Sequence, residues 1–210
     1  MNFLISGTDT GVGKTYVACG LIRALRKSGR PAVGLKPLCS GGWEDIEAIM
    51  NANEQAVPLH VVNSVSFQAP LAPYAAALVE NRTFDLVAAK MNFAGIQSQF
   101  SPIFVEGAGG LLVPILRDYD FGDLAADWGL GLIIVAANRL GVLNHCRLIV
   151  EVAQRRGLSI SAIVLNELDD ETDVARQSNP SILEDVLEKP VIRLAYGATD
   201  FGAVVRELGI

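Results

Sequence analysis

Short apolar runs alternate along the chain with longer segments in which apolar and polar positions repeat at helical spacing. Each apolar run is four to seven residues long, is rich in Val, Ile and Leu, and lacks strict apolar–polar alternation. Strands of this kind are buried on both faces, as in a parallel sheet covered by helices. The predicted strands are Asn2–Ser6, Ala32–Lys36, Ile103–Glu106, Leu132–Ala136, Ile160–Asn166 and Val191–Leu194.

The intervening segments predict helices. Over Lys14–Ser28, the side chains of Val17, Leu21 and Leu25 fall on one stripe, and Gly29 ends the pattern. The other predicted helices are Thr83–Gln99, Asn144–Arg156 and Ser181–Leu187. The stretch from Trp43 to Glu80 contains three prolines, so shorter helices and loops are expected there.

This alternation of strands and helices predicts a doubly wound, mostly parallel α/β sheet with helices on both faces, in a single domain over residues 1–210. In such folds ligands bind at the carboxyl ends of the strands. The residues that follow each predicted strand are therefore the candidates for a functional site.

Composition narrows the possible partners. Half of the 210 residues are apolar and the net charge is −6, which argues against a nucleic-acid or membrane-surface binder. The longest apolar stretch, Leu130–Ala137, is too short to span a membrane, and no signal peptide is apparent. Cys19, Cys39 and Cys146 are widely spaced without metal-ligand spacing, which favours reduced thiols in a cytoplasmic protein.

A glycine-rich loop connects the first predicted strand to the first predicted helix. It runs from Gly7 to Thr15 and ends in Gly-Lys-Thr. Gly11 and Gly13 allow backbone N–H groups to turn inward, Lys14 can reach β- and γ-phosphates, and the Thr15 hydroxyl can ligate Mg²⁺. The helix N-terminus adds partial positive charge. The loop therefore predicts ATP binding, although the first glycine of the usual motif stands one place early, at Gly7.

The full loop, Gly-Thr-Asp-Thr-x-Val-Gly-Lys-Thr, resembles the signature of the dethiobiotin synthetase family, whose fold is of the P-loop NTPase type. Three further motifs follow in the same order as in that family. They are Gly34-Leu35-Lys36-Pro37 with Ser40-Gly41, Glu106-Gly107-Ala108-Gly109-Gly110, and Leu140-Gly141-x-x-Asn144-His145. The resemblance spans nearly the whole chain.

The resemblance implies an ATP- and Mg²⁺-dependent cyclo-ligase of biotin biosynthesis. The enzyme would close 7,8-diaminopelargonate and CO₂ into dethiobiotin through a carbamate and a carbamic-phosphoric anhydride, releasing ADP and phosphate. The family also implies a homodimer that binds substrate at the subunit interface.

The resemblance also implies roles for individual residues. The residues implied in catalysis are Lys36, Lys14, Thr10 and Ser40. Nucleotide binding is implied for Gly11, Val12, Gly13, Lys14, Thr15, Tyr16, Asp45, Glu106, Gly107, Ala108, Gly109, Asn166, Glu167, Ala195 and Tyr196. Substrate contacts are implied for Thr10, Lys36, Ser40, Gly110, Gly141, Val142, Leu143 and Asn144.

The residue types agree with this chemistry. Glu106 ends an apolar strand, where an acid without a cation or donors would be costly, so with Thr15 it is a candidate Mg²⁺ ligand. Asp45 is the third candidate ligand, with Glu44 and Glu47 as competitors. Lys36 follows apolar and glycine residues at the ligand edge of the sheet, where its charge can assist phosphoryl transfer.

Some positions depart from the family pattern. Tyr74 stands where the family tends to have histidine. Ala195-Tyr196 stand where the family often has proline near the adenine, so the base specificity is open between ATP, CTP and GTP. His145, within the fourth motif, and Trp43 are interpreted as structural residues.

Three other classes share the predicted fold. A related P-loop amide-forming enzyme of the cobyrinic acid synthetase type usually carries a glutamine-hydrolysing domain, for which 210 residues leave no room. A partition-type ATPase switch typically has a second lysine early in its phosphate loop, and a small-molecule kinase has an arginine-rich lid. This chain has neither feature.

Overall fold

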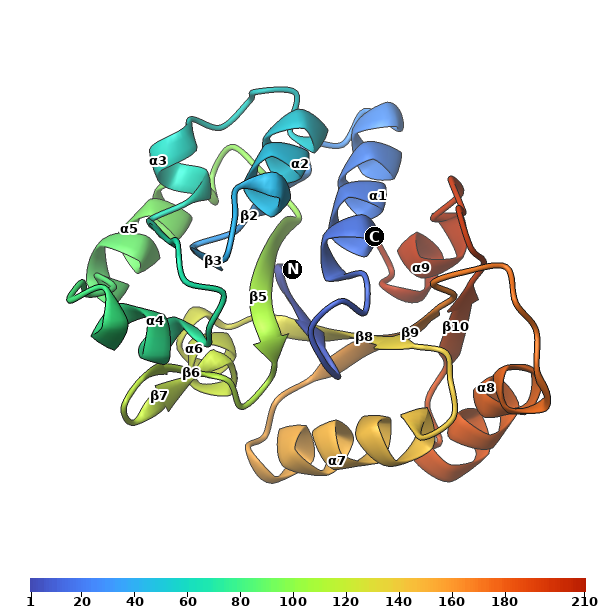
Figure 1. The fold of residues 1–210 in the computed structure, drawn as a ribbon. Coiled ribbons are helices and arrows are strands. Elements are labelled where there is room, and N and C mark those ends of the chain that lie inside the picture. Colours follow the sequence, from blue (N-terminus) through green and yellow to red (C-terminus); the bar gives the residue numbers. More distant parts are fainter.

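The computed structural model describes residues 1–210 and is built on a six-stranded sheet in the order β10-β9-β8-β1-β5-β2 (Figure 1). Every neighbouring pair in this sheet is parallel. The strands are β1 (Phe3–Gly7), β2 (Val33–Leu35), β5 (Ile103–Gly110), β8 (Gly131–Ala137), β9 (Ile160–Asn166) and β10 (Val191–Leu194). All six predicted strands are confirmed, and most of their apolar side chains are buried.

Helices cover both faces of this sheet (Figure 1). On one face lie α1 (Lys14–Lys27), α2 (Glu44–Ala52) and α9 (Gly202–Glu207); on the other lie α6 (Phe121–Trp128), α7 (Val142–Arg155) and α8 (Val174–Leu187). This arrangement confirms the doubly wound α/β architecture. None of the helices combines the length and the apolar character needed to cross a membrane.

The segment between Trp43 and Glu80 forms the short helices and loops that were predicted, and also one short strand that was not. Besides α2 it contains α3 (Leu59–Val62) and α4 (Pro73–Val79). Helix α5 (Leu86–Ile96) follows this segment. The strand of the segment, β4 (Val65–Phe67), pairs in parallel with β3 (Leu38–Ser40) in a small separate sheet. This small sheet lies next to the strand end that carries Lys36.

Two helix predictions were wrong in extent. The helix predicted from Thr83 begins only at Leu86, because the side chain of Asp85 accepts a hydrogen bond from the Ala88 N–H and caps the first turn. The helix predicted from Ser181 begins at Val174, where Asp173 is the cap, and Pro180 lies inside it.

Helices α6 and α9, the short strands β3 and β4 and one antiparallel hairpin were not predicted. The antiparallel pair β6 (Pro114–Leu116) and β7 (Tyr119–Asp120) leads into α6. A capping box between Asp120 and Asp123 starts α6, and Arg156 at the end of α7 pairs with Asp120 at 2.7 Å. The three cysteines are unpaired and buried, as expected for reduced thiols.

Candidate functional site

The glycine-rich loop joins the end of β1 to the start of α1, as predicted. Its glycines are required by geometry: a Cβ on Gly7 would lie 2.7 Å from the Asp9 carbonyl oxygen, and one on Gly13, whose φ is 94°, would lie 2.2 Å from Asn166 Nδ2. The position taken by Gly7, one residue earlier than in the usual motif, is therefore the one that needs a glycine.

Lys14 places a buried ammonium group in this loop. Its side chain is buried and Nζ donates to the Asp9 carbonyl oxygen at 3.1 Å. Burial and the nearby positive charge of Lys36 lower the pKa of Lys14. Because the structure gives Lys14 no paired carboxylate, its charge is available to an anion bound against the loop.

Lys36, Asp45, Glu106 and Thr15 converge opposite Lys14. The Lys36 ammonium lies 2.5 Å from Glu106 Oε1 and 2.8 Å from Asp45 Oδ2, and it also donates to the Gly107 carbonyl oxygen at 3.3 Å. Burial lowers the pKa of Lys36 and the two carboxylates raise it, with a net rise. The structure thus keeps Lys36 charged although its side chain is only 3% exposed.

The strand ends explain why these groups meet. Glu106 lies beside Ile5 in the parallel register of β5 with β1, and Lys36 follows the last residue of β2, which pairs with Val105. The register of β5 is irregular between Glu106 and Gly110, and Gly109 has a φ of 67°. The glycine run therefore bends the strand away just after Glu106 and opens room beside the phosphate loop.

The candidate metal ligands form an oxygen-rich cluster beside the Lys36 ammonium. Thr15 Oγ1 lies 2.7 Å from Asp45 Oδ1 and 2.8 Å from Glu106 Oε1, yet its single proton can serve only one of them. Glu106 Oε2 is buried without a hydrogen-bond partner. These donors are the oxygen ligands that Mg²⁺ prefers, so the residues present fit a magnesium ion. Of the three competing acids, Asp45 is the one brought to Thr15, whereas Glu44 and Glu47 are exposed on α2.

A cleft of about 710 Å³ lies over this group of residues. The sequence-predicted residues that line it are Thr10, Gly11, Gly13, Lys14, Thr15, Lys36, Ser40, Asp45, Glu106, Ala108 and Gly109. Sequence reasoning missed Cys39, Val113 and the Pro70–Pro73 turn, which also line the cleft. No local motif marks them. Cys39 and the turn before α4 reach the cleft because β3 and α4 fold back toward the phosphate loop, and Val113 reaches it from the segment that follows the glycine run of β5.

A second, more apolar groove of about 470 Å³ adjoins the cleft and shares Thr10, Gly109 and Val113 with it. Gly110, Leu111 and Leu112 line one side of this groove, and His145, Leu148, Ile149 and Val152 of α7 line the other. His145 is exposed there, in the first turn of α7.

The residues predicted to bind the base lie at the ends of β9 and β10. Asn166 Nδ2 donates to the Val12 carbonyl oxygen at 3.0 Å, whereas its Oδ1 is buried without a partner. The Glu167 carboxylate instead accepts from Arg193 Nε at 2.6 Å and Asn138 Nδ2 at 2.7 Å. Ala195 and Tyr196 are exposed. The hydroxyl of Tyr16 donates to the Ala198 carbonyl oxygen, which ties the loop after β10 to α1.

Four of the predicted substrate residues lie apart from the cleft. Gly141, Val142, Leu143 and Asn144 form the N-terminus of α7, and none of them lines the cleft that contains Lys36. Val142 is buried beneath the helix, whereas Gly141 and Asn144 are exposed. Leu140, just before them, is 86% exposed.

Solved structures with this architecture confirm the fold. The cell division ATPase MinD of Pyrococcus furiosus matches 91% of this chain and 81% of its own with a TM-score of 0.55 at 21% identity. The cell division protein FtsY of Thermotoga maritima matches 95% of this chain and 62% of its own with a TM-score of 0.54 at 14% identity. At these identities the likeness concerns the fold alone.

Sequence relatives are closer. A family model described as an AAA domain matches residues 1–193. The protein called ATP-dependent dethiobiotin synthetase BioD in Anaeromyxobacter sp. (strain K) is 40% identical, over 98% of this chain and 94% of the relative. The protein of the same name in Aquifex aeolicus is 38% identical, over 89% of this chain and 84% of the relative. With this identity over nearly its whole length, and with the phosphate loop and strand-end lysine in place, the chain belongs to the ATP-dependent dethiobiotin synthetase family.

Proposed function

We propose that the protein catalyses the ATP-dependent closure of 7,8-diaminopelargonate and CO₂ into dethiobiotin. The observation that carries this proposal is the placement of two ammonium groups, Lys14 and Lys36, at one cleft that continues into an apolar groove. The cleft suits a triphosphate and the reacting amines, and the groove suits the aliphatic chain of the substrate. A simple ATPase would not need the second compartment.

The proposed reaction proceeds in three balanced steps. One amine nitrogen attacks CO₂ and loses a proton, giving a carbamate. A carbamate oxygen then attacks the γ-phosphorus as the bond to the bridging oxygen breaks, and ADP leaves. The second amine attacks the carbamoyl carbon, phosphate leaves, a proton is lost, and the cyclic urea closes. Phosphorylation is needed because an unmodified carbamate is a poor electrophile.

The residues act mainly by position and charge, as phosphoryl transfer requires. Lys14 would hold the β- and γ-phosphates, and Lys36 would face the carbamate and the phosphoryl group in transit. At about 4 Å and an effective dielectric near 20, each such contact is worth about 4 kcal/mol before desolvation. Thr10 and Ser40 line the same cleft and would donate or accept hydrogen bonds at the amines and carbamate.

Thr15, Asp45 and Glu106 are the proposed magnesium ligands. When bound, the ion would neutralise phosphate charge during the transfer. The free Oε2 of Glu106 supports this assignment, because a buried carboxylate oxygen without a donor is otherwise unexplained.

The base is proposed to bind between Asn166 and the loop after β10. The bond from Asn166 Nδ2 to Val12 fixes the amide, so its unpartnered Oδ1 is presented as an acceptor. An acceptor at this place matches the exocyclic amino group of adenine and disfavours the carbonyl oxygen of guanine. Glu167, Ala195 and Tyr196 would frame the base.

Replacing Asn166 with leucine tests whether Asn166 binds the adenine base. Loss of a hydrogen bond to a buried group costs about 1–3 kcal/mol, so the KM for ATP should rise about 5- to 150-fold. The preference for ATP over GTP, measured by competition, should fall by a similar factor. The KM for diaminopelargonate serves as the internal control, since Asn166 lies outside the substrate cleft. An unchanged nucleotide preference would contradict the assignment.

We further propose that the enzyme is a homodimer in which the N-terminus of α7 serves the partner's site. Gly141 to Asn144 do not line the cleft of their own chain, and their helix N-terminus suits the substrate carboxylate. Leu140, Leu112 and Leu148 are 86%, 51% and 54% exposed, which fits a face covered by a second copy.

The three cysteines bear on the location of the protein in the cell. Because they are unpaired, they suit a reducing compartment, and we assign the protein to the cytoplasm.

Dilution tests the shared site. Specific activity should fall as the protein concentration drops below the dimer dissociation constant, in step with the fraction of dimer measured by mass photometry. A monomer with full activity would contradict a site built from two chains.

The decisive experiment for the function is direct. Purified protein is incubated with ATP, Mg²⁺, bicarbonate and 7,8-diaminopelargonate, and the cyclic urea is sought by mass spectrometry. We expect one ADP for each ureido product. A Lys14→Ala variant, which removes the loop ammonium, provides the matched negative control. Folded wild-type protein that forms no ureido product would refute the proposal.

A further inference from the structure

Lys36 lies just beyond the main sheet, and a separate segment holds its backbone. Its N–H donates to the Val62 carbonyl oxygen at 2.8 Å. The carbonyl oxygen of the next residue, Pro37, accepts from the N–H groups of Ser64 and Val65 at 3.0 and 3.1 Å. Proline has no N–H, so the carbonyl of Lys36 is the one backbone polar group of this dipeptide that these bonds leave without a partner.

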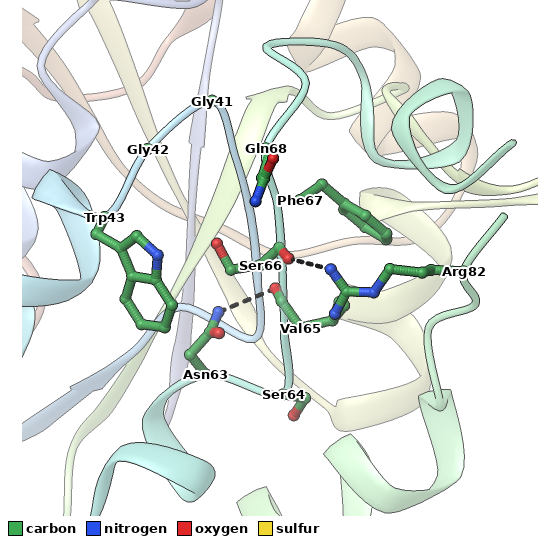
Figure 2. A pocket seen from close by; sticks show the side chains of 10 residues that line it. All are labelled: Gly41, Gly42, Trp43, Asn63, Ser64, Val65, Ser66, Phe67, Gln68 and Arg82. Atoms are coloured by element: carbon green, nitrogen blue, oxygen red, sulfur yellow. Dashed lines mark hydrogen bonds between the residues drawn. The ribbon is translucent and has the colours of Figure 1, made fainter. Parts of the chain in front are cut away.

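That carbonyl is held by a side chain. Asn63 Nδ2 donates to the Lys36 carbonyl oxygen at 2.7 Å and to the Val65 carbonyl oxygen at 3.1 Å. Figure 2 shows the Asn63 amide directed at the Val65 carbonyl, at the wall of a pocket that also includes Trp43. The side chain of Asn63 is nearly buried. Every backbone polar group of the Lys36–Pro37 dipeptide is thus bonded to residues 62–65, and Asn63 supplies the single side-chain contact among them.

We propose that Asn63 is a positioning residue for Lys36. Its amide fixes the peptide plane that follows Lys36, and that plane sets the direction in which the lysine side chain leaves the backbone toward the cleft. The inference rests on the proposed function, because it takes Lys36 as the group that faces the phosphoryl group in transit. A displacement of about 1 Å in such a group can cost about a hundredfold in rate.

The chain offers a matched control on the same edge strand. Asn53 makes the equivalent contact with β2: its Nδ2 donates to the Gly34 carbonyl oxygen at 2.9 Å, and its Oδ1 accepts from the Gly34 N–H at 2.7 Å. Asn53 is fully buried, and neither it nor Gly34 lines the cleft. Loss of the Asn53–Gly34 hydrogen bonds therefore weakens β2 but leaves the hydrogen bonds to the Lys36 backbone in place.

The test compares Asn63→Asp with Asn53→Asp. Each aspartate keeps the shape of the side chain but cannot donate while ionised. Both should lower Tm, by about 6–20 °C for a chain of this length, because each places a carboxylate in a buried site facing a carbonyl oxygen. Asn63→Asp should lower kcat about 10- to 100-fold while the KM for ATP stays within about threefold, because the phosphates are held by the loop before α1. Asn53→Asp should leave kcat within about twofold at a temperature well below both Tm values.

Asn63→Ala repeats the measurement without a new charge and decides the outcome if the aspartate variant does not fold. Wild-type kcat in the folded Asn63 variants, or an equal loss of kcat in Asn53→Asp, would overturn the positioning role. These outcomes differ from failure of the proposed function, in which the wild-type enzyme itself forms no ureido product.

Discussion

Replacing Lys36 with glutamine is expected to lower kcat about a thousandfold. A lysine–phosphoryl contact worth about 4 kcal/mol in the transition state corresponds to nearly three factors of ten in rate. Glutamine retains an N–H donor near Glu106 and the Gly107 carbonyl, so the shape of the site is kept while the positive charge is lost. The effect should appear in kcat from single-turnover measurements, with little change in ATP affinity, because Lys14 and the loop amides hold the nucleotide.

The stability of this variant separates catalysis from folding. Lys36 is buried between Glu106 and Asp45, and removing one member of a buried ion pair costs about 3–5 kcal/mol because the remaining charge loses its partner. The double variant Lys36→Gln/Glu106→Gln removes both charges of the tighter pair and should recover much of the lost Tm without recovering activity. Lys27→Gln, at an exposed lysine of α1, controls for the substitution itself. A loss of kcat below tenfold in folded Lys36→Gln would remove Lys36 from the mechanism.

The sheet was predictable because its sequence signal is local. Phe3, Leu4 and Ile5 are fully buried, and so are Leu132 and Ile133, since each strand has helices on both sides. A continuous apolar run bounded by turns therefore marks each strand without any knowledge of its partners. The phosphate loop was predictable for a similar reason, since Gly7 and Gly13 are required by contacts within a few residues or at a fixed strand end.

Features that depend on tertiary contacts were not predictable in the same way. The start of α8 was missed because Pro180 and the preceding acids suggest a loop, whereas the structure uses Asp173 as a cap and pairs Asp169 with Arg176. Helix α6 is short, and its start is secured by Arg156 from a distant helix. The choice of Asp45 over Glu44 and Glu47 follows from the amphipathic face of α2, which buries Ile46 and Ile49 and so points Asp45 toward Thr15. No sequence motif marks Asn63, because its contact with Lys36 forms only when the chain folds so that the start of β4 lies beside the end of β2.

Replacing Glu106 with glutamine is expected to raise the Mg²⁺ concentration needed for half-maximal activity about a hundredfold. A carboxylate and a divalent ion about 4 Å apart attract each other by about 8 kcal/mol at an effective dielectric near 20, and a third of this surviving desolvation gives the stated factor. The amide keeps one oxygen next to Thr15 but carries no charge. Saturating Mg²⁺ should restore part of kcat, which distinguishes weakened metal binding from a lost catalytic group.

The controls for this second variant follow from the geometry of the cluster. Thr15→Ser keeps the ligand oxygen and should lower the Mg²⁺ affinity far less than Thr15→Ala. Glu151→Gln, which removes an exposed acid on α7 that pairs only with Arg155, controls for the loss of a carboxylate elsewhere in the chain. Titration of Mg²⁺ into the ADP-bound protein measures the same affinity without turnover, so a loss seen in both assays locates the effect in metal binding. A Glu106→Gln enzyme with wild-type Mg²⁺ dependence would show that the unpartnered Oε2 has another purpose, and the Thr15–Asp45–Glu106 cluster would then have to be understood as a buried ion-pair site for Lys36 alone.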